Sequence, residues 1–243
     1  MRLENKVAVI TGSSRGLGAA FARAFVREGA RVVITYVSQA EEGQKIADEL
    51  DAGLALQMDV RNREDVRSVF EEAVRRHGHL DILVNNAGIN RTADFDQQTD
   101  EEWAEVMDVC MTGVFRTCQE VLPFISDGGR IINIGSLSGE YGGPRTPSYA
   151  VAKMGVMALT HNLARFLAPR NICVNCLSPG VIGGEFTDQT MSPDVREKAL
   201  QYMLLKRFAD YEEMTGAAVF LASDEASYTT AQTISVNGGA WVR

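Results

Sequence analysis

The chain has 243 residues, of which 45% are hydrophobic and 23% are charged. A chain of this length can bury one large core, and α/β proteins of this size are often a single domain. The formal net charge of -8 gives no basic surface for nucleic acid and disfavours binding to anionic membranes. We therefore expect neither a nucleic-acid partner nor a membrane partner.

The N-terminal sequence MRLENKVAVITG passes from polar residues directly into a short apolar run, without the hydrophobic region and cleavage site of a signal peptide. No apolar stretch reaches about 18 residues, the length that a transmembrane helix needs. The cysteines Cys110, Cys118, Cys173 and Cys176 are too scattered for a disulfide framework, and the histidines are not spaced as ligands. We expect a cytoplasmic protein without a metal site.

Short β-branched runs alternate with longer segments of helical period along the whole chain. The predicted strands lie near residues 6–10, 31–35, 54–58, 81–84, 130–135, 171–177 and 232–236. The helical segments include AAFARAFVREG, which places Phe21 and Phe25 on one face and Gly29 as a C-terminal cap. This alternation is typical of a parallel sheet covered by helices on both faces, so we predict one α/β domain over residues 1–243.

The sequence TDEE predicts a capping box with Thr99 as N-cap and Glu102 at its third position, and the helix is expected to run to about Phe124. Residues 183–198 show no clear period and follow a predicted strand. Ligands bind at that edge of an open α/β sheet, so a mobile lid over about 183–205 and an inert surface loop are both open.

The sequence TGSSRGLG directly follows the first predicted strand and places Gly12, Gly16 and Gly18 at the start of a helix. Glycines allow a tight turn and a close approach of the backbone to a pyrophosphate. The helix N-terminus adds free N–H groups and a partial positive charge. The motif therefore predicts a dinucleotide site.

The end of the second strand, RVVITYVS, indicates which dinucleotide is bound. A carboxylate there would bind the ribose 2′-hydroxyl of NAD, but Tyr36 and Ser38 occupy this turn. Arg15 could reach a 2′-phosphate as a charge-assisted partner, so NADP(H) is favoured over NAD(H). The alternative is that Arg15 is only a solvated side chain and that Tyr36 stacks on adenine.

Two further strand ends carry polar residues. Asp59 in QMDV is placed to accept a hydrogen bond from the adenine amino group, and Asn86, Ala87 and Gly88 in NNAG would let the backbone pass close to the adenosine. Taken singly, each of these is equally compatible with ordinary turn chemistry.

The sequence SYAVAKMG places Tyr149 and Lys153 on the same face of a predicted helix, about 5–6 Å apart at Cβ. An ammonium about 5 Å from a developing phenolate contributes roughly 3 kcal/mol at an effective dielectric constant of about 20. This predicts a lowered pKa for Tyr149, suited to general acid/base transfer. Ser136, at the end of the fifth predicted strand, would hold a substrate oxygen beside it.

The motifs TGSSRGLG, MDV, NNAG, IGSLSG, YAVAK, SPG and ISVNGG occur in this order over the whole chain. In this the sequence resembles the short-chain dehydrogenase/reductase superfamily. The resemblance implies a Rossmann-type, doubly wound, seven-stranded parallel sheet and hydride transfer at a nicotinamide carbon. It implies that Tyr149 is the acid/base, that Lys153 holds the nicotinamide ribose and lowers the pKa of Tyr149, and that Ser136 orients the substrate oxygen.

The resemblance and the motifs together give the set of expected cofactor contacts. They are Gly12, Ser14, Arg15, Gly16, Leu17, Gly18, Tyr36, Ser38, Asp59, Val60, Asn86, Ala87, Gly88, Tyr149, Lys153, Pro179, Gly180, Val181 and Ile182. The last four would line the nicotinamide. Similar proteins are often tetramers, so a homo-oligomer, either a tetramer or a dimer, is expected.

The chain departs from the family pattern at two positions. Cys110 in DVCMTG stands where the family usually has an asparagine that fixes a water in a proton relay, and a thiol is a poor substitute. Either a backbone carbonyl or rearranged water completes the relay, or turnover is slow and specialised. Gly183 and Gly184 stand where a threonine often contacts the nicotinamide amide, and Thr187 is the expected substitute.

The substrate pocket is expected to involve residues 90–95, 137–145 and 183–205. The resemblance is nearest to 3-oxoacyl-carrier-protein reductases, but an acidic carrier needs basic docking groups and the turn before the fifth strand reads SDGG, which leaves Arg170 available. We expect a small or mid-sized carbonyl or alcohol substrate, with a carrier-bound one as the alternative. A nucleotide-binding regulator without useful turnover is the alternative of another class.

Overall fold

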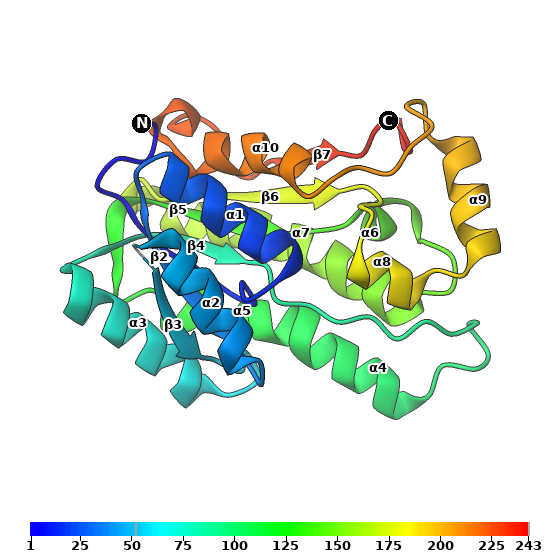
Figure 1. Cartoon of the computed structure of the whole chain (residues 1–243), viewed down its shortest axis with the longest axis horizontal. Coiled ribbons are helices and arrows are strands. Elements are labelled where there is room, and N and C mark those ends of the chain that lie inside the picture. The colour runs from blue at the N-terminus through cyan, green and yellow to red at the C-terminus, as the bar shows by residue number, and fades with distance from the viewer. Residues whose placement is uncertain (52, 243) are drawn as a thin grey trace.

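The computed structural model describes residues 1–51 and 53–242 and contains a seven-stranded sheet between two layers of helices (Figure 1). All paired strands are parallel, and their spatial order is β3-β2-β1-β4-β5-β6-β7. The strands are β1 Val7–Ile10, β2 Arg31–Tyr36, β3 Gly53–Gln57, β4 Leu80–Asn85, β5 Ile125–Ile134, β6 Cys173–Pro179 and β7 Thr233–Val236. The predicted doubly wound α/β sheet is confirmed.

All seven predicted strands are present, and β5 shows the largest difference in extent. It begins at Ile125 rather than near residue 130. Its pairing with β4 changes register between Leu80 and Ile82, and Gly128 within it has a φ of +77°. The early part of β5 is therefore an irregular extension that a β-branched pattern does not reveal.

The helices form a layer on each face of the sheet and a cluster toward the carboxyl ends of the strands (Figure 1). One layer contains α1 Gly16–Arg27, α2 Ala40–Leu50 and α10 Glu212–Ala222. The other contains α3 Arg63–His77, α5 Gly113–Glu120 and α7 Pro147–Leu167. The remaining helices are α4 Asp100–Met107, α6 Leu137–Tyr141, α8 Glu185–Thr190 and α9 Pro193–Tyr202, with the short turns η1 Asp108–Thr112, η2 Ala168–Arg170 and η3 Asp224–Ala226.

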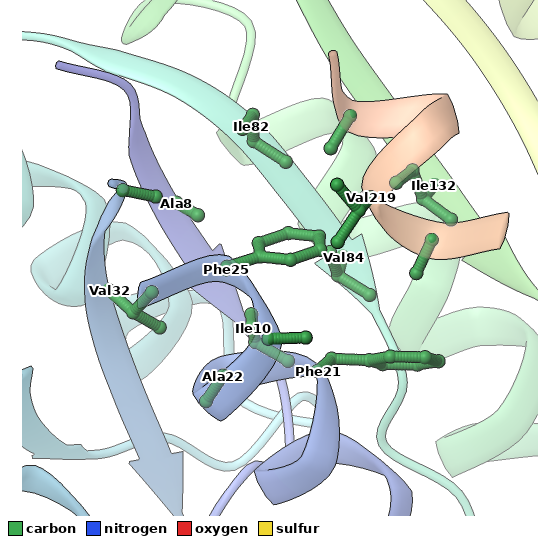
Figure 2. Packing of buried hydrophobic residues seen from close by; sticks show 14 of the residues in the cluster. Ala8, Ile10, Phe21, Ala22, Phe25, Val32, Ile82, Val84, Ile132 and Val219 are labelled. Atoms are coloured by element: carbon green, nitrogen blue, oxygen red, sulfur yellow. The ribbon is translucent and has the colours of Figure 1, made fainter. Parts of the chain in front are cut away.

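The core under α1 follows from the predicted amphipathic pattern. Phe21 and Phe25 are fully buried and point toward the sheet and α10 (Figure 2). Gly29 has a φ of +95° just after the helix, as its predicted role as a C-terminal cap requires. The labelled residues around the two phenylalanines are Ala8, Ile10, Ala22, Val32, Ile82, Val84, Ile132 and Val219.

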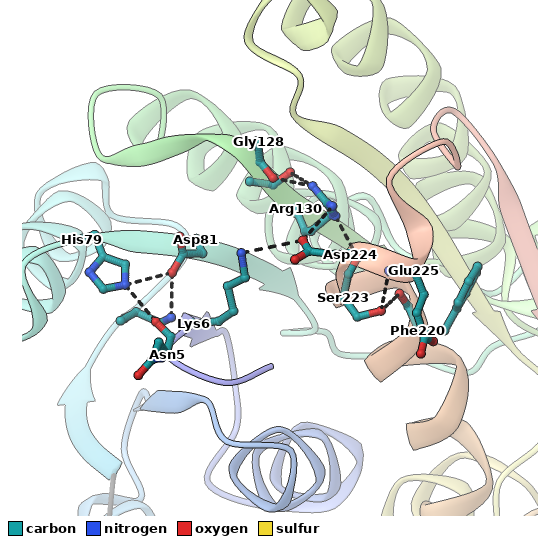
Figure 3. Close-up of polar contacts among 12 residues, drawn as sticks. Asn5, Lys6, His79, Asp81, Gly128, Arg130, Phe220, Ser223, Asp224 and Glu225 are labelled. Atoms are coloured by element: carbon teal, nitrogen blue, oxygen red, sulfur yellow. Dashed lines mark hydrogen bonds and ion pairs between the residues drawn. The ribbon is translucent and has the colours of Figure 1, made fainter. Parts of the chain in front are cut away.

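The amino edge of the sheet is held by a polar network (Figure 3). The Asp81 carboxylate accepts a hydrogen bond from the Val7 amide at 2.9 Å and lies 3.1 Å from Nε2 of His79. The buried Arg130 side chain donates from Nε to the Ser223 carbonyl at 3.2 Å. These contacts fix the starts of β1 and β4 and the end of α10, at the edge opposite the glycine loop.

The prediction of one continuous helix from Thr99 to about Phe124 is wrong in its interior. The capping box at Thr99 and Glu102 is present, but α4 and α5 are separated by the π-helical turn η1, and α5 ends at Glu120. Such turns add one residue to the helix and occur often at functional sites. The turn leads into Gly113, where a Cβ atom would lie only 2.7 Å from Cγ2 of Val60.

The segment 183–198, which shows no period in the sequence, contains two helices. Of these, α8 buries only Thr187, and α9 buries no residue at all. Neither helix therefore needs an apolar stripe, which is the signal that sequence periodicity detects. The start of α9 carries Ser192 as N-cap and Pro193 in the first turn.

The described residues bear on three further expectations. None of the helices in this part of the chain is long and apolar enough to cross a membrane. All four cysteines are buried free thiols, and Cys173 and Cys176 lie in β6, as predicted. Over the same residues, His, Cys, Asp and Glu side chains form no group of three or more that could hold a metal ion.

Replacement of Phe25 by alanine tests the packing of α1. The side chain is fully buried, so we expect Phe25→Ala to lower the free energy of unfolding by about 3–5 kcal/mol. The control is Phe95→Ala, because Phe95 is 87% exposed and should change stability by about 0.5 kcal/mol or less. Urea denaturation at one protein concentration measures both, and equal effects would contradict the packing described.

Candidate active site

The glycine loop between β1 and α1 is shaped for close contact with a ligand. Gly12 has a φ of +63°, and a Cβ atom there would lie 3.1 Å from Cα of Ala87. A Cβ atom on Gly18 would lie 2.6 Å from both Nδ2 of Asn86 and the carbonyl oxygen of Gly12. Only glycine fits these positions without displacing the neighbouring chain.

Two threonines that the sequence analysis did not assign hold this loop. The Thr11 hydroxyl accepts hydrogen bonds from the amides of Asn86 and Ala87, each at 2.9 Å. The Thr35 hydroxyl accepts from the Gly12 amide at 2.9 Å. Both threonines are buried at the carboxyl ends of apolar strands, and that position is the signal by which they could have been found.

The loop and the start of α1 fit a pyrophosphate. Gly16 begins α1, and the N-cap residue Arg15 makes no side-chain hydrogen bond to the first turn. The first N–H groups of the helix are therefore not satisfied by a cap, which is the arrangement that anions bind. Ser14 is buried beneath this turn, and Leu17 packs against the α1 core.

Asn86 and Asp59, which were expected near the adenosine, each bind another group of the protein. Asn86 donates from Nδ2 to the carbonyls of Thr11 and Gly12, so its side chain fixes the loop. The Asp59 carboxylate accepts from the Arg61 guanidinium at 2.6 Å, and this hydrogen bond lowers the pKa of Asp59. Its binding to an adenine amino group stays a prediction.

Tyr36, Ser38 and Arg15 are the residues expected near the ribose 2′ position. The Tyr36 ring lies against α2, since a Cβ atom on Gly43 would be 2.7 Å from it, and Ser38 is exposed. The Arg15 guanidinium pairs with Glu185 at 2.8 Å, and about half of the Arg15 side chain is exposed. The residues that directly follow β2 are Val37, Ser38 and Gln39, and the preference for NADP(H) stays a prediction.

The segment after β6, expected to line the nicotinamide, is held on both sides. The Gly180 amide donates to the Val236 carbonyl at 2.9 Å, and a Cβ atom on Gly180 would lie 2.6 Å from Cα of Asn237. Val181 accepts from the Ala209 amide at 3.1 Å. Pro179 ends β6, and Ile182 pairs with Ala209 in an isolated bridge.

The hydroxyl of Thr187 was expected to contact the nicotinamide amide. It donates instead to the Ile182 carbonyl at 2.5 Å, and the residue is 6% exposed. In this structure Thr187 therefore fastens α8 to the segment after β6.

Ser136, Tyr149 and Lys153 come together at the carboxyl end of β5. The Ser136 hydroxyl forms a hydrogen bond with the Tyr149 side chain and accepts the Ser138 amide at 3.1 Å as the N-cap of α6. Nζ of Lys153 lies 5.5 Å from the centroid of the Tyr149 ring. The spacing of four residues on α7 thus puts both side chains in one site, as predicted.

The expected lowering of the Tyr149 pKa by Lys153 is not found. Burial raises the pKa of Tyr149, a smaller contribution from Cys110 acts in the same direction, and the hydrogen bond from Ser136 lowers it. The physical reason is the burial of the phenol, which Lys153 does not offset: Lys153 is 2% exposed and donates from Nζ to the Ile134 carbonyl at 2.7 Å. The ammonium is thus bound to β5 rather than to the phenol oxygen.

Cys110, at the family's asparagine position, lies in η1 and is fully buried. Its Sγ donates to the Ile89 carbonyl at 3.2 Å and accepts from the Ile89 amide at 3.3 Å. Burial raises the pKa of this thiol, although Lys153 and the Ile89 amide act in the opposite direction. The thiol therefore holds the chain after NNAG, and both explanations for the missing asparagine stay open as predictions.

Behind the site, a buried pair of amides joins the sheet to two helices. Asn85 and Asn133 are register partners on β4 and β5, and Nδ2 of Asn85 donates to Oδ1 of Asn133 at 2.8 Å. Thr117 on α5 donates to Asn85 at 2.6 Å, and Asn133 donates to Thr160 on α7 at 2.9 Å. Because all four residues are buried, this network fixes α5 and α7 relative to the sheet.

Of the three segments expected around the substrate, 183–205 contacts Tyr149, and 90–95 and 137–145 contact each other. Phe186 on α8 has its ring centroid 6.1 Å from that of Tyr149. Residues 89–98 contact the segment before α7 through Asp94, which pairs with Arg145 at 3.0 Å. A cavity of about 190 Å³ lies beside them, lined by Phe95, Gln98, Thr99, Asp100, Trp103 and Pro147.

The C-terminal segment was not predicted to reach the site region, but it does. Trp241 stacks on Tyr141 at the end of α6, with ring centroids 5.9 Å apart. A cavity of about 140 Å³ lies beneath Val181 and Leu205, and neither Tyr149 nor Ser136 lines it. Nothing in the spacing of Trp241 along the chain signals this contact.

The doubly wound sheet, the glycine cradle and the serine, tyrosine and lysine at the end of β5 define a nucleotide-binding oxidoreductase of the Rossmann type, and the comparisons narrow the class. Residues 12–240 match the family described as enoyl-(acyl carrier protein) reductase. The chain belongs to the short-chain dehydrogenase/reductase family.

Curated relatives include the 3-oxoacyl-(acyl-carrier-protein) reductases FabG of Thermotoga maritima and Vibrio cholerae, both 38% identical. The first match covers 98% of this chain and 99% of the relative, and the second covers all of both. Solved structures include a dehydrogenase/reductase of Sinorhizobium meliloti, with a TM-score of 0.94 and 33% identity over 99% of this chain and 96% of that one. A blue fluorescent protein from a metagenomic library, in complex with NADPH, has a TM-score of 0.92 and 32% identity over the whole of both chains.

Titration of Tyr149 tests the raised pKa. Burial should keep this phenol protonated beyond about pH 10 in the protein without nucleotide. The difference in phenolate absorbance between the wild type and Tyr149→Phe should therefore be flat from pH 6 to about pH 10. The matched control is Tyr228→Phe, which removes a fully exposed phenol. A Tyr149 transition near neutral pH would contradict the effect of burial.

Proposed function

We propose that this protein is an NADP(H)-dependent ketoreductase that interconverts a carbonyl and a secondary alcohol. The observation that carries the proposal is the meeting of Ser136, Tyr149 and buried Lys153 at the end of β5, at the same edge of the sheet as a glycine loop in which Gly12 and Gly18 leave no space for a Cβ atom. The relatives named as 3-oxoacyl reductases and the NADPH-bound neighbour support the reaction and the cofactor.

In the proposed mechanism, the cofactor supplies or accepts the hydride when it is bound. Ser136 holds the substrate oxygen, and the Tyr149 phenol donates the proton to that oxygen during reduction and removes it during oxidation. The raised pKa of Tyr149 keeps the proton available for reduction at neutral pH. Lys153 would bind the nicotinamide ribose through the Nζ donors that the Ile134 carbonyl does not use.

The substrate is proposed to be a small or mid-sized carbonyl compound with an apolar body. Phe186 and Phe95 supply apolar surface near the site, and each is more than one-third exposed. Nearby cations are already paired, Arg145 with Asp94 and Arg196 with Asp188. Arg170, the expected docking group for an acidic carrier, pairs with Asp127.

A carrier-bound 3-oxoacyl thioester is the second candidate, and the names of the full-length relatives favour it. The family description names reduction of an enoyl group, so a C=C substrate belongs in the same assay. The segment 183–205 is proposed as the lid over whichever substrate binds, because α9 buries none of its side chains.

The assembly is proposed to be a homo-oligomer formed through α4, α5 and α7. Apolar side chains on these helices are partly exposed, namely Trp103, Phe115, Val151, Met154 and Phe166. We propose that these side chains form one apolar patch, because large contiguous apolar patches on a surface mark protein interfaces. The cytoplasm is the proposed location, which fits four unpaired thiols.

Replacement of Tyr149 tests the mechanism. We expect Tyr149→Phe to lower kcat for ketone reduction about 10²–10⁴-fold, because the proton donor is lost, while the Kd for NADPH changes little. The control is Tyr228→Phe, because Tyr228 is fully exposed and lies outside the proposed site and lid, so kcat should not change. Activity unchanged in Tyr149→Phe would overturn the mechanism.

The substrate panel contains small ketones, 3-oxoacyl thioesters free and carrier-bound, and an enoyl thioester. Turnover of free ketones supports the first candidate, and turnover restricted to carrier-bound 3-oxoacyl groups supports the second. Tight NADPH binding without turnover of any of them would favour a nucleotide-binding regulator.

A further inference from the structure

The Arg15 side chain, expected to meet the 2′-phosphate of NADP(H), has a competing partner on α8. Its Nη1 atom lies 2.8 Å from Oε1 of Glu185, and both side chains are about half exposed. The two residues lie far apart in the sequence, so the contact joins the glycine loop to the segment after β6. Glu185 also accepts a hydrogen bond from Gln189 at 3.1 Å, which holds its carboxylate in place.

The glycine loop lies directly against the strand end that governs the 2′ position. The Gly12 amide donates to the Thr35 hydroxyl, and the Ser13 amide donates to the Thr35 carbonyl, each at 2.9 Å. Thr35 precedes Tyr36, the last residue of β2. Arg15 thus extends from a loop fixed to the end of β2, where a 2′-phosphate would lie.

Glu185 is positioned by a second contact between the same two segments. The Tyr211 hydroxyl lies between the glycine loop and α8, because a Cβ atom would be 3.6 Å from it on Gly16 and 2.6 Å from it on Gly184. Gly184 has a φ of +129° and directly precedes Glu185. The carboxylate is therefore presented to Arg15 by a backbone conformation that favours glycine.

We infer that Glu185 is a specificity-determining residue for the cofactor, because it competes with the 2′-phosphate for Arg15. The inference rests on the proposed function. An NADP(H) molecule must draw the guanidinium from Glu185, whereas NAD(H) leaves the pair intact. The next residue, Phe186, has its ring centroid 6.1 Å from that of Tyr149, so the pair stands next to the proposed acid/base in the chain.

The test measures the Kd values of NADPH and NADH by calorimetry in the wild type, Glu185→Gln and Glu212→Gln. Glu212 is the matched control, since it pairs with Arg27 at 2.9 Å with similar exposure, away from the glycine loop. We expect Glu185→Gln to raise the preference for NADPH, as the ratio of the two Kd values, about two- to five-fold, the range of an exposed ion pair. Glu212→Gln should leave the ratio unchanged.

The same measurement in Arg15→Ala and in Arg15→Ala combined with Glu185→Gln isolates the interaction. Without Arg15, the glutamine substitution should no longer change the ratio. An unchanged ratio in Glu185→Gln, or a change that persists without Arg15, overturns the inference while the ketoreductase proposal stands. Failure of the wild type to bind either nucleotide would overturn the proposed function and this inference together.

Discussion

The site depends on one buried cation. Lys153 is 2% exposed, and an ammonium in such surroundings is costly unless its donors are satisfied. Its bond to the Ile134 carbonyl meets part of that need and joins α7 to the end of β5 at one atom pair. Ser136 comes two residues after Ile134, and Tyr149 comes one helical turn before Lys153. The same contact therefore fixes the distance between the serine and the tyrosine.

Polar groups buried behind the site make this junction rigid. The Asn85 and Asn133 amides bridge β4 and β5 and bond to Thr117 and Thr160 on the covering helices. A shift of α7 along the sheet would leave these buried groups unsatisfied, which costs more than the loss of apolar contact alone. Tyr149 and Lys153 lie on α7, and this network therefore holds them in a fixed position relative to the sheet.

The fold could be predicted from the sequence because patterns among neighbouring residues mark its helices and strands. Phe21 and Phe25 repeat on the helical period, and each buried strand is a short β-branched run, so all seven strands were found. The glycine loop and the pair Tyr149 and Lys153 were found for a similar reason, since backbone approach and helical spacing depend on neighbours in the sequence.

The features that were not predicted from the sequence depend on contacts between residues that lie far apart in the chain. The direction of the Tyr149 pKa follows from burial by other segments, and the orientation of Lys153 follows from a carbonyl on β5. The pairing of Arg15 with Glu185 joins the glycine loop after β1 to the segment after β6. The helices α8 and α9 bury almost none of their side chains, so no apolar residues repeat with the helical period in their sequences.

The π-helical turn Asp108–Thr112 has a geometrical consequence for the helix that follows it. Each residue of an α-helix advances the chain by about 100° around the axis. The wider turn therefore sets the angular phase of everything after it, and it lets Cys110 face Ile89 while Val114 and Cys118 still face the sheet. A chain shortened by one residue here would regain regular helical geometry and rotate one of these two faces out of alignment.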